Sequence, residues 1–77
     1  MKVKVIFFGI LNEITGKKNL YMSDIQSSAE LEKKLFELFP KMKKVNFKMA
    51  CNKKIILGNF NFKNNDEIAM LPPFSGG

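Results

Sequence analysis

The 77 residues of this chain are enough for one domain with a single hydrophobic core. One cysteine and no histidine exclude an internal disulfide, a zinc site and a histidine-dependent triad, and no GxxxxGK[ST] motif is present to cradle ATP. The net charge of +6 comes from lysine alone, with six lysines between Lys41 and Lys54. Because arginine is missing, a nucleic-acid-binding module is a weaker interpretation than a compositional bias or an acidic protein partner.

The N-terminal residues "MKVKVIFFGI" alternate lysine with apolar side chains, which is typical of a strand and not of a signal peptide. No apolar run approaches the roughly 18 residues that a membrane-spanning helix needs. We therefore expect a cytoplasmic protein with no membrane or nucleic-acid partner.

The first half of the chain predicts a hairpin followed by a helix. Residues 2–9 form a strand with Val3, Val5 and Phe7 inward and Phe8 outward, and 10–15 form a short helical turn that ends at Gly16. Residues 17–23 read as a second strand paired with the first. A capping box begins the main helix, whose start is marked by Ser27 and Glu30 and whose end is marked by Pro40. The apolar stripe of this helix comprises Leu31, Leu35, Leu38 and Phe39.

The second half predicts three more strands. Val45, Phe47, Met49 and Cys51 alternate inward, so we interpret Cys51 as a small core residue and not a reactive thiol. Residues 55–57 form a short strand, 64–67 a turn, and 68–71 a final strand that Pro72 and Pro73 end. In this last strand Ile68 and Met70 face inward, and Ala69 and Leu71 face outward.

This order predicts an α+β roll of the β-grasp kind, with a mixed sheet of about five strands curled around one main helix. The first and last strands are expected to be central neighbours, which places Phe8 and Leu71 on the same exposed face. We expect one domain over residues 1–77, with a flexible C-terminal tail over 72–77.

The chain ends in "LPPFSGG", and this tail is the candidate active part. Pro72 and Pro73 extend the segment, Phe74 can anchor in a partner's pocket, and glycines at 76 and 77 let the backbone enter a narrow channel. The only functional group at the tip is the carboxylate of Gly77, which is inert until a separate ATP-using enzyme converts it to an acyl-adenylate. The activated carbonyl can then take an amine, giving conjugation, or sulfur, giving a nucleophilic thiocarboxylate.

Several segments resemble the molybdopterin synthase small subunits of the MoaD/ThiS family of ubiquitin-like sulfur carriers. "VKVIFFGILNEITG" resembles the family's opening strand and short helix, "ACN" its "AVN", "NNDEIA" its "DGDEVA", and "LPPFSGG" its "PPxSGG" ending. The resemblance spans nearly the whole chain, and the Pro-Pro before the glycines is its most specific part.

The resemblance implies a sulfur carrier in molybdenum cofactor biosynthesis. An E1-like adenylyltransferase using ATP and Mg²⁺ would activate Gly77, a sulfurtransferase would supply the sulfur, and the segment Pro72, Pro73, Phe74, Ser75 and Gly76 would insert into the large catalytic subunit. Sulfur would then pass to cyclic pyranopterin monophosphate. The family implies a heterotetramer whose transferase activity resides with the large subunit, while this chain itself binds no metal or cofactor.

The resemblance also implies partner-binding positions at Phe8, Asn12, Ile55 and Leu71. Many family members have arginine where this chain has Asn12, so a charged contact is missing or replaced there. Three alternatives stay open: a sulfur carrier for thiamin thiazole synthesis, a ubiquitin-like protein modifier, and a basic nucleic-acid-binding module.

Overall fold

Residues 1–73 are described by the computed structural model, and their elements follow the order expected from the sequence. The elements are β1 (Lys2–Phe7), α1 (Ile10–Thr15), β2 (Asn19–Ser23), α2 (Ser28–Leu38), the 3₁₀ helix η1 (Pro40–Lys44), β3 (Lys48–Cys51), β4 (Lys54–Ile55) and β5 (Glu67–Leu71). In this part of the chain no helix has the length and apolar character needed to cross a membrane. Four positions of the predicted tail, Phe74, Ser75, Gly76 and Gly77, lie outside the described residues.

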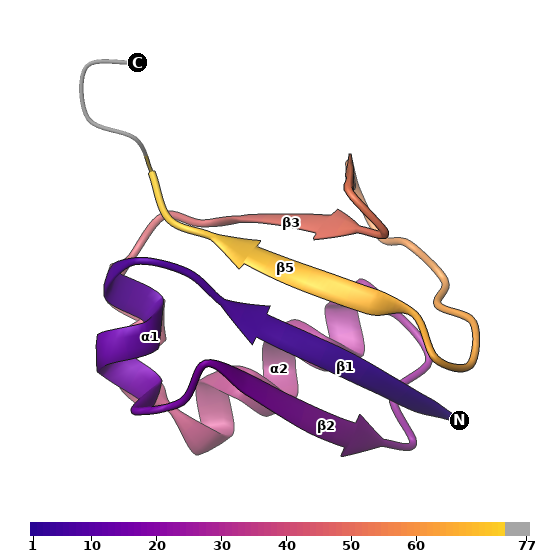
Figure 1. Ribbon diagram of the computed structural model, residues 1–77, viewed down its shortest axis with the longest axis horizontal. Coiled ribbons are helices and arrows are strands. Elements are labelled where there is room, and N and C mark those ends of the chain that lie inside the picture. The colour runs from indigo at the N-terminus through magenta and orange to yellow at the C-terminus, as the bar shows by residue number, and fades with distance from the viewer. Residues whose placement is uncertain (74–77) are drawn as a thin grey trace.

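The five strands form one mixed sheet in the order β2-β1-β5-β3-β4. β1 and β5 are central and parallel, whereas the other pairs are antiparallel. α2 lies across one face of this sheet, and α1 stands at the end where β1 and β5 finish (Figure 1). The predicted α+β roll of five strands around one main helix is therefore confirmed.

Alternation explains β1 and β5, and a capping box explains the start of α2. Val3 and Val5 of β1 and Ile68 of β5 are fully buried under α2. The hydroxyl of Ser27 accepts the N–H of Glu30 at 3.3 Å, as the sequence predicts. In a capping box the Glu30 carboxylate would accept the backbone N–H of Ser27. Here it accepts the backbone N–H of Gln26, the residue before the cap, at 3.4 Å.

The core between the sheet and α2 is apolar throughout. It comprises Val3, Val5, Phe7, Leu11, Met22, Ile25, Leu31, Leu35, Met42, Met49, Cys51, Phe62, Ile68 and Met70. The prediction that Leu38 faces the core is wrong, because its side chain is 50% exposed. Met42 of η1, which the helical pattern did not include, is fully buried instead. Phe39 packs against the core as expected, and its ring meets that of Phe7 edge-on at 6.1 Å.

Strand boundaries differ from the prediction where the backbone turns. β1 ends at Phe7 because Gly9 takes a φ of 57° before α1. Asn52 and Lys53 have φ values of 49° and 74°, which makes a tight hairpin and leaves β4 only Lys54–Ile55. Leu57, expected in this strand, is 87% exposed.

Candidate functional site

The candidate site is the face of the sheet that α2 leaves uncovered. In Figure 1 this face is turned toward the viewer, with α2 behind the strands and α1 beside them. The core side chains of β1 and β5 point to α2, so the alternate residues of both strands point to the open side. We call this open side the outer face.

A row of apolar side chains crosses the outer face from one strand to the next. The register pairs Ile6 with Ala69, Ala69 with Ala50, and Ala50 with Ile55. Directly paired residues point to the same side of a sheet, so these four lie side by side. Ile55 is 52% exposed at the end of the row, whereas Ala50 is only 5% exposed.

Phe8 and Leu71 continue this apolar area toward the end of β5. Leu71 is two residues after Ala69 and pairs with Lys48, and Phe8 is two residues after Ile6. The N–H of Phe8 donates to the carbonyl of Met70 at 3.2 Å, which keeps Phe8 beside β5. Phe8 is 46% exposed and Leu71 is partly exposed. Phe8, Ile55 and Leu71 therefore share the outer face as expected, and their role in partner binding stays a prediction.

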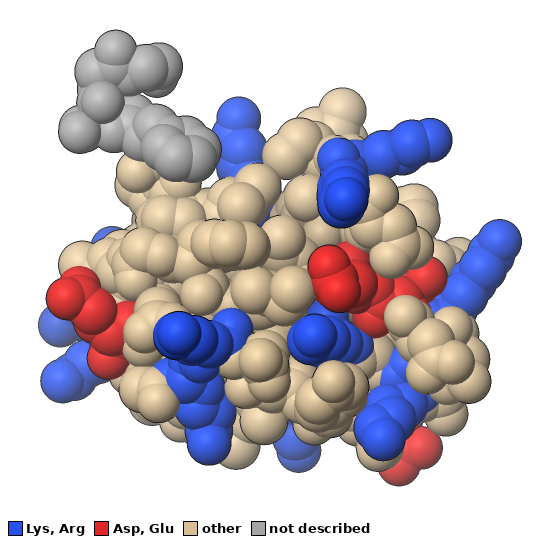
Figure 2. Space-filling view, in the orientation of Figure 1, with Lys and Arg blue, Asp and Glu red and all other residues tan. Residues whose placement is uncertain are grey.

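The other half of the outer face is charged. Lys4 pairs with Tyr21 and Glu67, and the ammonium groups of Lys2 and Lys4 lie 5.3 and 5.9 Å from the centre of the Tyr21 ring. Both distances are within the range of cation–π contacts. Figure 2 shows uncharged surface across the middle of this face, with lysine and acidic side chains around it. An apolar area with a mixed polar rim is the usual anatomy of a protein–protein contact.

The described base of the tail borders the apolar half. β5 runs from Leu71 directly into Pro72, which is partly exposed, and Pro73, which is exposed. A hollow of about 470 Å³ lies beside these residues, and its wall is completed by Ile55 and by residues 46–48. The tail thus leaves the fold from the end of the apolar area.

Gly9 belongs to this region, although the sequence did not predict a role for it. It lies between β1 and α1, and a Cβ at this position would meet Cγ of Pro72 at 2.9 Å. The only sequence signal was a glycine directly before a helical turn, which does not indicate a contact with a proline 63 residues later.

Asn12 lies at the α1 border of the outer face. A surface hollow of about 600 Å³ includes Asn12 together with Phe8, Ile10, Glu13 and Lys18. The backbone carbonyl of Asn12 accepts the N–H of Gly16 at 2.8 Å, which closes α1. Asn12 is therefore next to Phe8, and any contact of its side chain with a partner stays a prediction.

The opposite end of the sheet is held by a cluster of hydrogen bonds around Asp66. Its carboxylate accepts the N–H of Lys63 at 2.8 Å and the side-chain amide of Asn52 at 2.9 Å. The Asn52 side chain in turn accepts the N–H of Glu67 at 3.0 Å. The segments "ACN" and "NNDE" thus join β5 to the β3–β4 hairpin. Within residues 1–73 their role is structural, at the end of β5 away from the tail.

This cluster sets the ionisation of two groups. Desolvation, followed by the hydrogen bond and the negative charge of Asp66, raises the pKa of the buried Cys51 thiol to about 11. Desolvation would also raise the pKa of Asp66, but hydrogen bonds from Lys63, Asn52 and Cys51 and the Lys63 charge outweigh it and lower the pKa. Cys51 is therefore a buried, protonated core residue, as expected, and a poor nucleophile.

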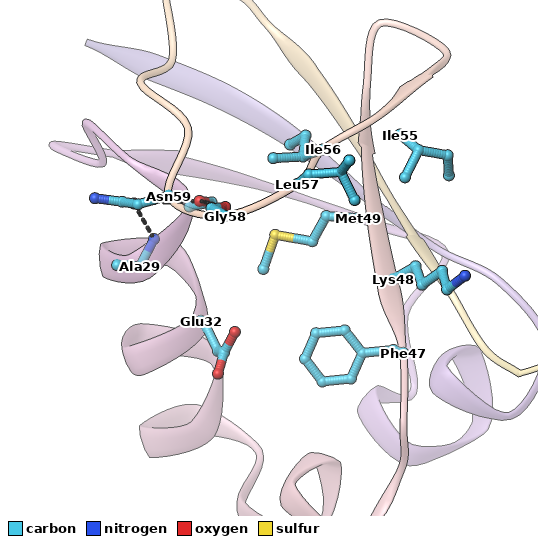
Figure 3. A pocket seen from close by; sticks show the side chains of 11 residues that line it. Ala29, Glu32, Phe47, Lys48, Met49, Ile55, Ile56, Leu57, Gly58 and Asn59 are labelled. Carbon is cyan, nitrogen blue, oxygen red and sulfur yellow. Dashed lines mark hydrogen bonds between the residues drawn. The ribbon is translucent and has the colours of Figure 1, made fainter.

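A third hollow lies between α2 and the β3–β4 edge. It encloses about 430 Å³, and Figure 3 shows Ala29 and Glu32 of α2 on one side and Phe47 and Met49 on the other. The side chain of Asn59 accepts the N–H of Ala29 at 3.0 Å at its rim. Glu32 and Lys48 are the ionisable groups of its lining.

The lysine-rich segment is divided among several elements. Lys41, Lys43 and Lys44 lie on η1, Lys48 begins β3, and Lys53 lies in the hairpin turn. In residues 1–73 no three acidic, cysteine or histidine side chains gather in a way that could hold a metal ion.

Comparison with known proteins gives matches over most of the chain. The model of the ThiS family matches residues 5–77. A protein of Dictyostelium discoideum named "Molybdopterin synthase sulfur carrier subunit" is 32% identical over 82 residues, covering 96% of this chain and 94% of the relative.

Two solved structures are similar over the full length. One is a complex of subunits 1 and 2 of the molybdopterin-converting factor from Helicobacter pylori, with 30% identity, a TM-score of 0.75 and 100% of both chains covered. The other is the small archaeal modifier protein 1 of Methanosarcina acetivorans, with 28% identity and a TM-score of 0.83, covering 99% of this chain and 96% of that protein.

Proposed function

Because this chain belongs to the ThiS family, we propose that it is a sulfur carrier and the small subunit of a molybdopterin synthase. The observation that carries the proposal is structural. β5 contributes Ala69 and Leu71 to an uncovered apolar face and then runs directly into Pro72 and Pro73. β5 therefore connects an apolar surface suited to docking with the C-terminal segment whose carboxylate would carry the sulfur.

The names of two relatives agree with this assignment. The Dictyostelium relative is called a molybdopterin synthase sulfur carrier subunit, and the Helicobacter structure contains subunit 1 bound to subunit 2. By analogy, the outer face of this chain would dock on a large catalytic subunit. The apolar residues Phe8, Ile55 and Leu71 would form the buried centre of that contact.

The chemistry follows from the terminal carboxylate of Gly77. An E1-like adenylyltransferase would join it to the adenylyl group of ATP, releasing pyrophosphate. A persulfide on a sulfurtransferase would then displace AMP to give an acyl disulfide, and a thiol reductant would cleave this to the thiocarboxylate. The resulting thiocarboxylate is an anionic nucleophile at neutral pH. In the large subunit it would give its sulfur to cyclic pyranopterin monophosphate, and two such rounds would build a dithiolene. The chain is then a co-substrate, acting in the cytoplasm, while the large subunit carries the transferase activity.

Intact-mass analysis tests the first half of this proposal. Incubation with ATP and the E1-like enzyme and sulfur donor of the same cell should replace one oxygen of the chain by sulfur. A variant with one residue added after Gly77 is the matched control, because its carboxylate is displaced from the partner's catalytic atoms. Thiolation of both forms, or of neither, contradicts the proposal.

A transfer assay separates this pathway from the thiazole pathway. The thiocarboxylated chain, mixed with the large subunit, should convert cyclic pyranopterin monophosphate to the dithiolene product. A thiolated chain that fails here and restores growth of a thiamin-requiring strain would instead be a thiazole sulfur carrier.

A ubiquitin-like modifier is a second candidate, favoured by the similarity to the small archaeal modifier protein. It predicts that Gly77 is joined through an isopeptide bond to lysines of other proteins. Peptide mass spectrometry of cell extracts should detect such branched peptides if this candidate holds. Finding only free and thiocarboxylated chain removes it.

A further inference from the structure

Gly9 occupies a backbone conformation that side chains avoid. Its φ of 57° and ψ of −132° lie in a region accessible almost only to glycine. The turn is tied to the start of α1, because Gly9 accepts the N–H of Asn12 at 3.0 Å and Phe8 accepts that of Leu11 at 3.1 Å. The conformation is thus fixed by the helix that follows it.

The space that a side chain would fill at Gly9 is taken by Pro72. A Cβ there would come within 2.9 Å of the Pro72 Cγ, closer than such contacts occur. The proline ring is closed on its own backbone, so it cannot rotate away as a flexible side chain would. The Phe8 N–H bond to Met70 holds the two segments together immediately before this contact. Pro72 therefore packs against Gly9 in a space, here called the seat, that any larger residue at position 9 would fill.

We propose that Gly9 is a positioning residue for sulfur transfer, which seats Pro72 and so fixes the direction in which the tail leaves the sheet. This inference rests on the proposed function. Five residues follow Pro72 and reach at most about 18 Å from it, so the direction set at Pro72 limits which part of a partner Gly77 can approach. Displacements of about 1 Å are enough to slow an oriented reaction by up to about a hundredfold.

The test is Gly9→Ala, made thiocarboxylated from an intein thioester and sulfide so that activation is bypassed. Docking on the large subunit should stay within about threefold, because the outer face is intact, while transfer at saturating large subunit should fall by about tenfold or more. Gly16→Ala and Gly58→Ala are controls for placing alanine at a positive φ with no neighbour to meet. Their φ values are 72° and 68°, and nothing lies within 4 Å of the added Cβ. These controls should transfer at the rate of the unsubstituted chain.

A double variant distinguishes the seat from backbone strain. Pro72→Ala in the Gly9→Ala background removes the ring that the new Cβ meets, so transfer should recover to the rate of Pro72→Ala alone. If the losses of transfer rate in the two single variants simply add in the double variant, the proposal is overturned. Unchanged transfer in Gly9→Ala also overturns it.

The contact itself is measurable without any variant that has to fold. NMR of the unsubstituted chain should show nuclear Overhauser effects between the Pro72 ring protons and a Gly9 Hα, and their absence overturns the proposal. Failure of the unsubstituted thiocarboxylate to transfer sulfur, with these effects present, would instead refute the proposed function.

Discussion

Replacing Asp66 by asparagine should weaken the end of the sheet away from the tail, and only above acidic pH. The ionised carboxylate accepts bonds of 2.8 Å from the Lys63 N–H and 2.9 Å from the Asn52 amide. Asparagine keeps one acceptor oxygen but loses the charge and the second acceptor. Hydrogen bonds to charged groups contribute about 1.5–3 kcal/mol each. Because Asp66 is partly exposed, solvent screening reduces the combined loss to about 1–2 kcal/mol.

The direction of the pH dependence follows from the lowered pKa of Asp66. A carboxylate with a lower pKa in the folded than in the unfolded chain stabilises the fold at pH values above its ordinary value of 3.8. That contribution is lost as the pH falls through the folded pKa, because the protonated group no longer accepts both bonds as an anion. The unsubstituted chain should therefore approach the stability of Asp66→Asn in strong acid.

Urea unfolding between pH 7 and pH 2 measures both effects. At pH 7 the variant should lose about 1–2 kcal/mol, which lowers the melting temperature by about 4–16 °C for a domain of this size. Asp24→Asn is the matched control, since Asp24 lies outside the hydrogen-bond cluster of Asp66 and asparagine tolerates its φ of 60°. A loss in Asp66→Asn that persists unchanged at pH 2 would refute the role assigned to its charge.

Three further predictions concern the outer face and the core. Leu71→Asp should weaken binding of the large subunit at least about tenfold in calorimetry and change the unfolding free energy by less than about 1 kcal/mol. Unfolding of the domain by this substitution would contradict the outward position of Leu71. Cys51 should react with a thiol reagent at pH 8 only after urea unfolds the chain, and rapid reaction of the folded chain would contradict a pKa of about 11. Met42→Ala should cost about 2–5 kcal/mol in urea unfolding, whereas Leu38→Ala should cost less than about 1, and equal losses would contradict their different burial.

The sequence predicted the fold because local patterns and tertiary contacts agree in most of the chain. Alternation placed Val3, Val5 and Ile68 inward, and the cap at Ser27 began α2. These signals act over two to four residues, so they can be read without knowing the partners. The β-grasp arrangement then followed from connection rules for hairpins and crossovers.

The features that the sequence did not predict depend on contacts between segments far apart in the chain. Helical periodicity put Leu38 inward, but the 3₁₀ turn after Pro40 brings Met42 into the core instead. The contact between Gly9 and Pro72 joins the end of β1 to the end of β5 and has no local signature. Its position depends on the parallel register of two strands that are more than 50 residues apart in the chain.

The two ends of β5 have different physical tasks. At its start, Asp66 and Asn52 fix the strand to the hairpin through hydrogen bonds that make no use of the outer face. At its end, Leu71 and Pro72 rest on apolar surface and on the glycine turn. A substitution at the first end should therefore change stability with little effect on docking, and one at the second should change docking or transfer with little effect on stability. The proposed function would use that separation, because the tail would enter a partner while the body of the chain stays folded.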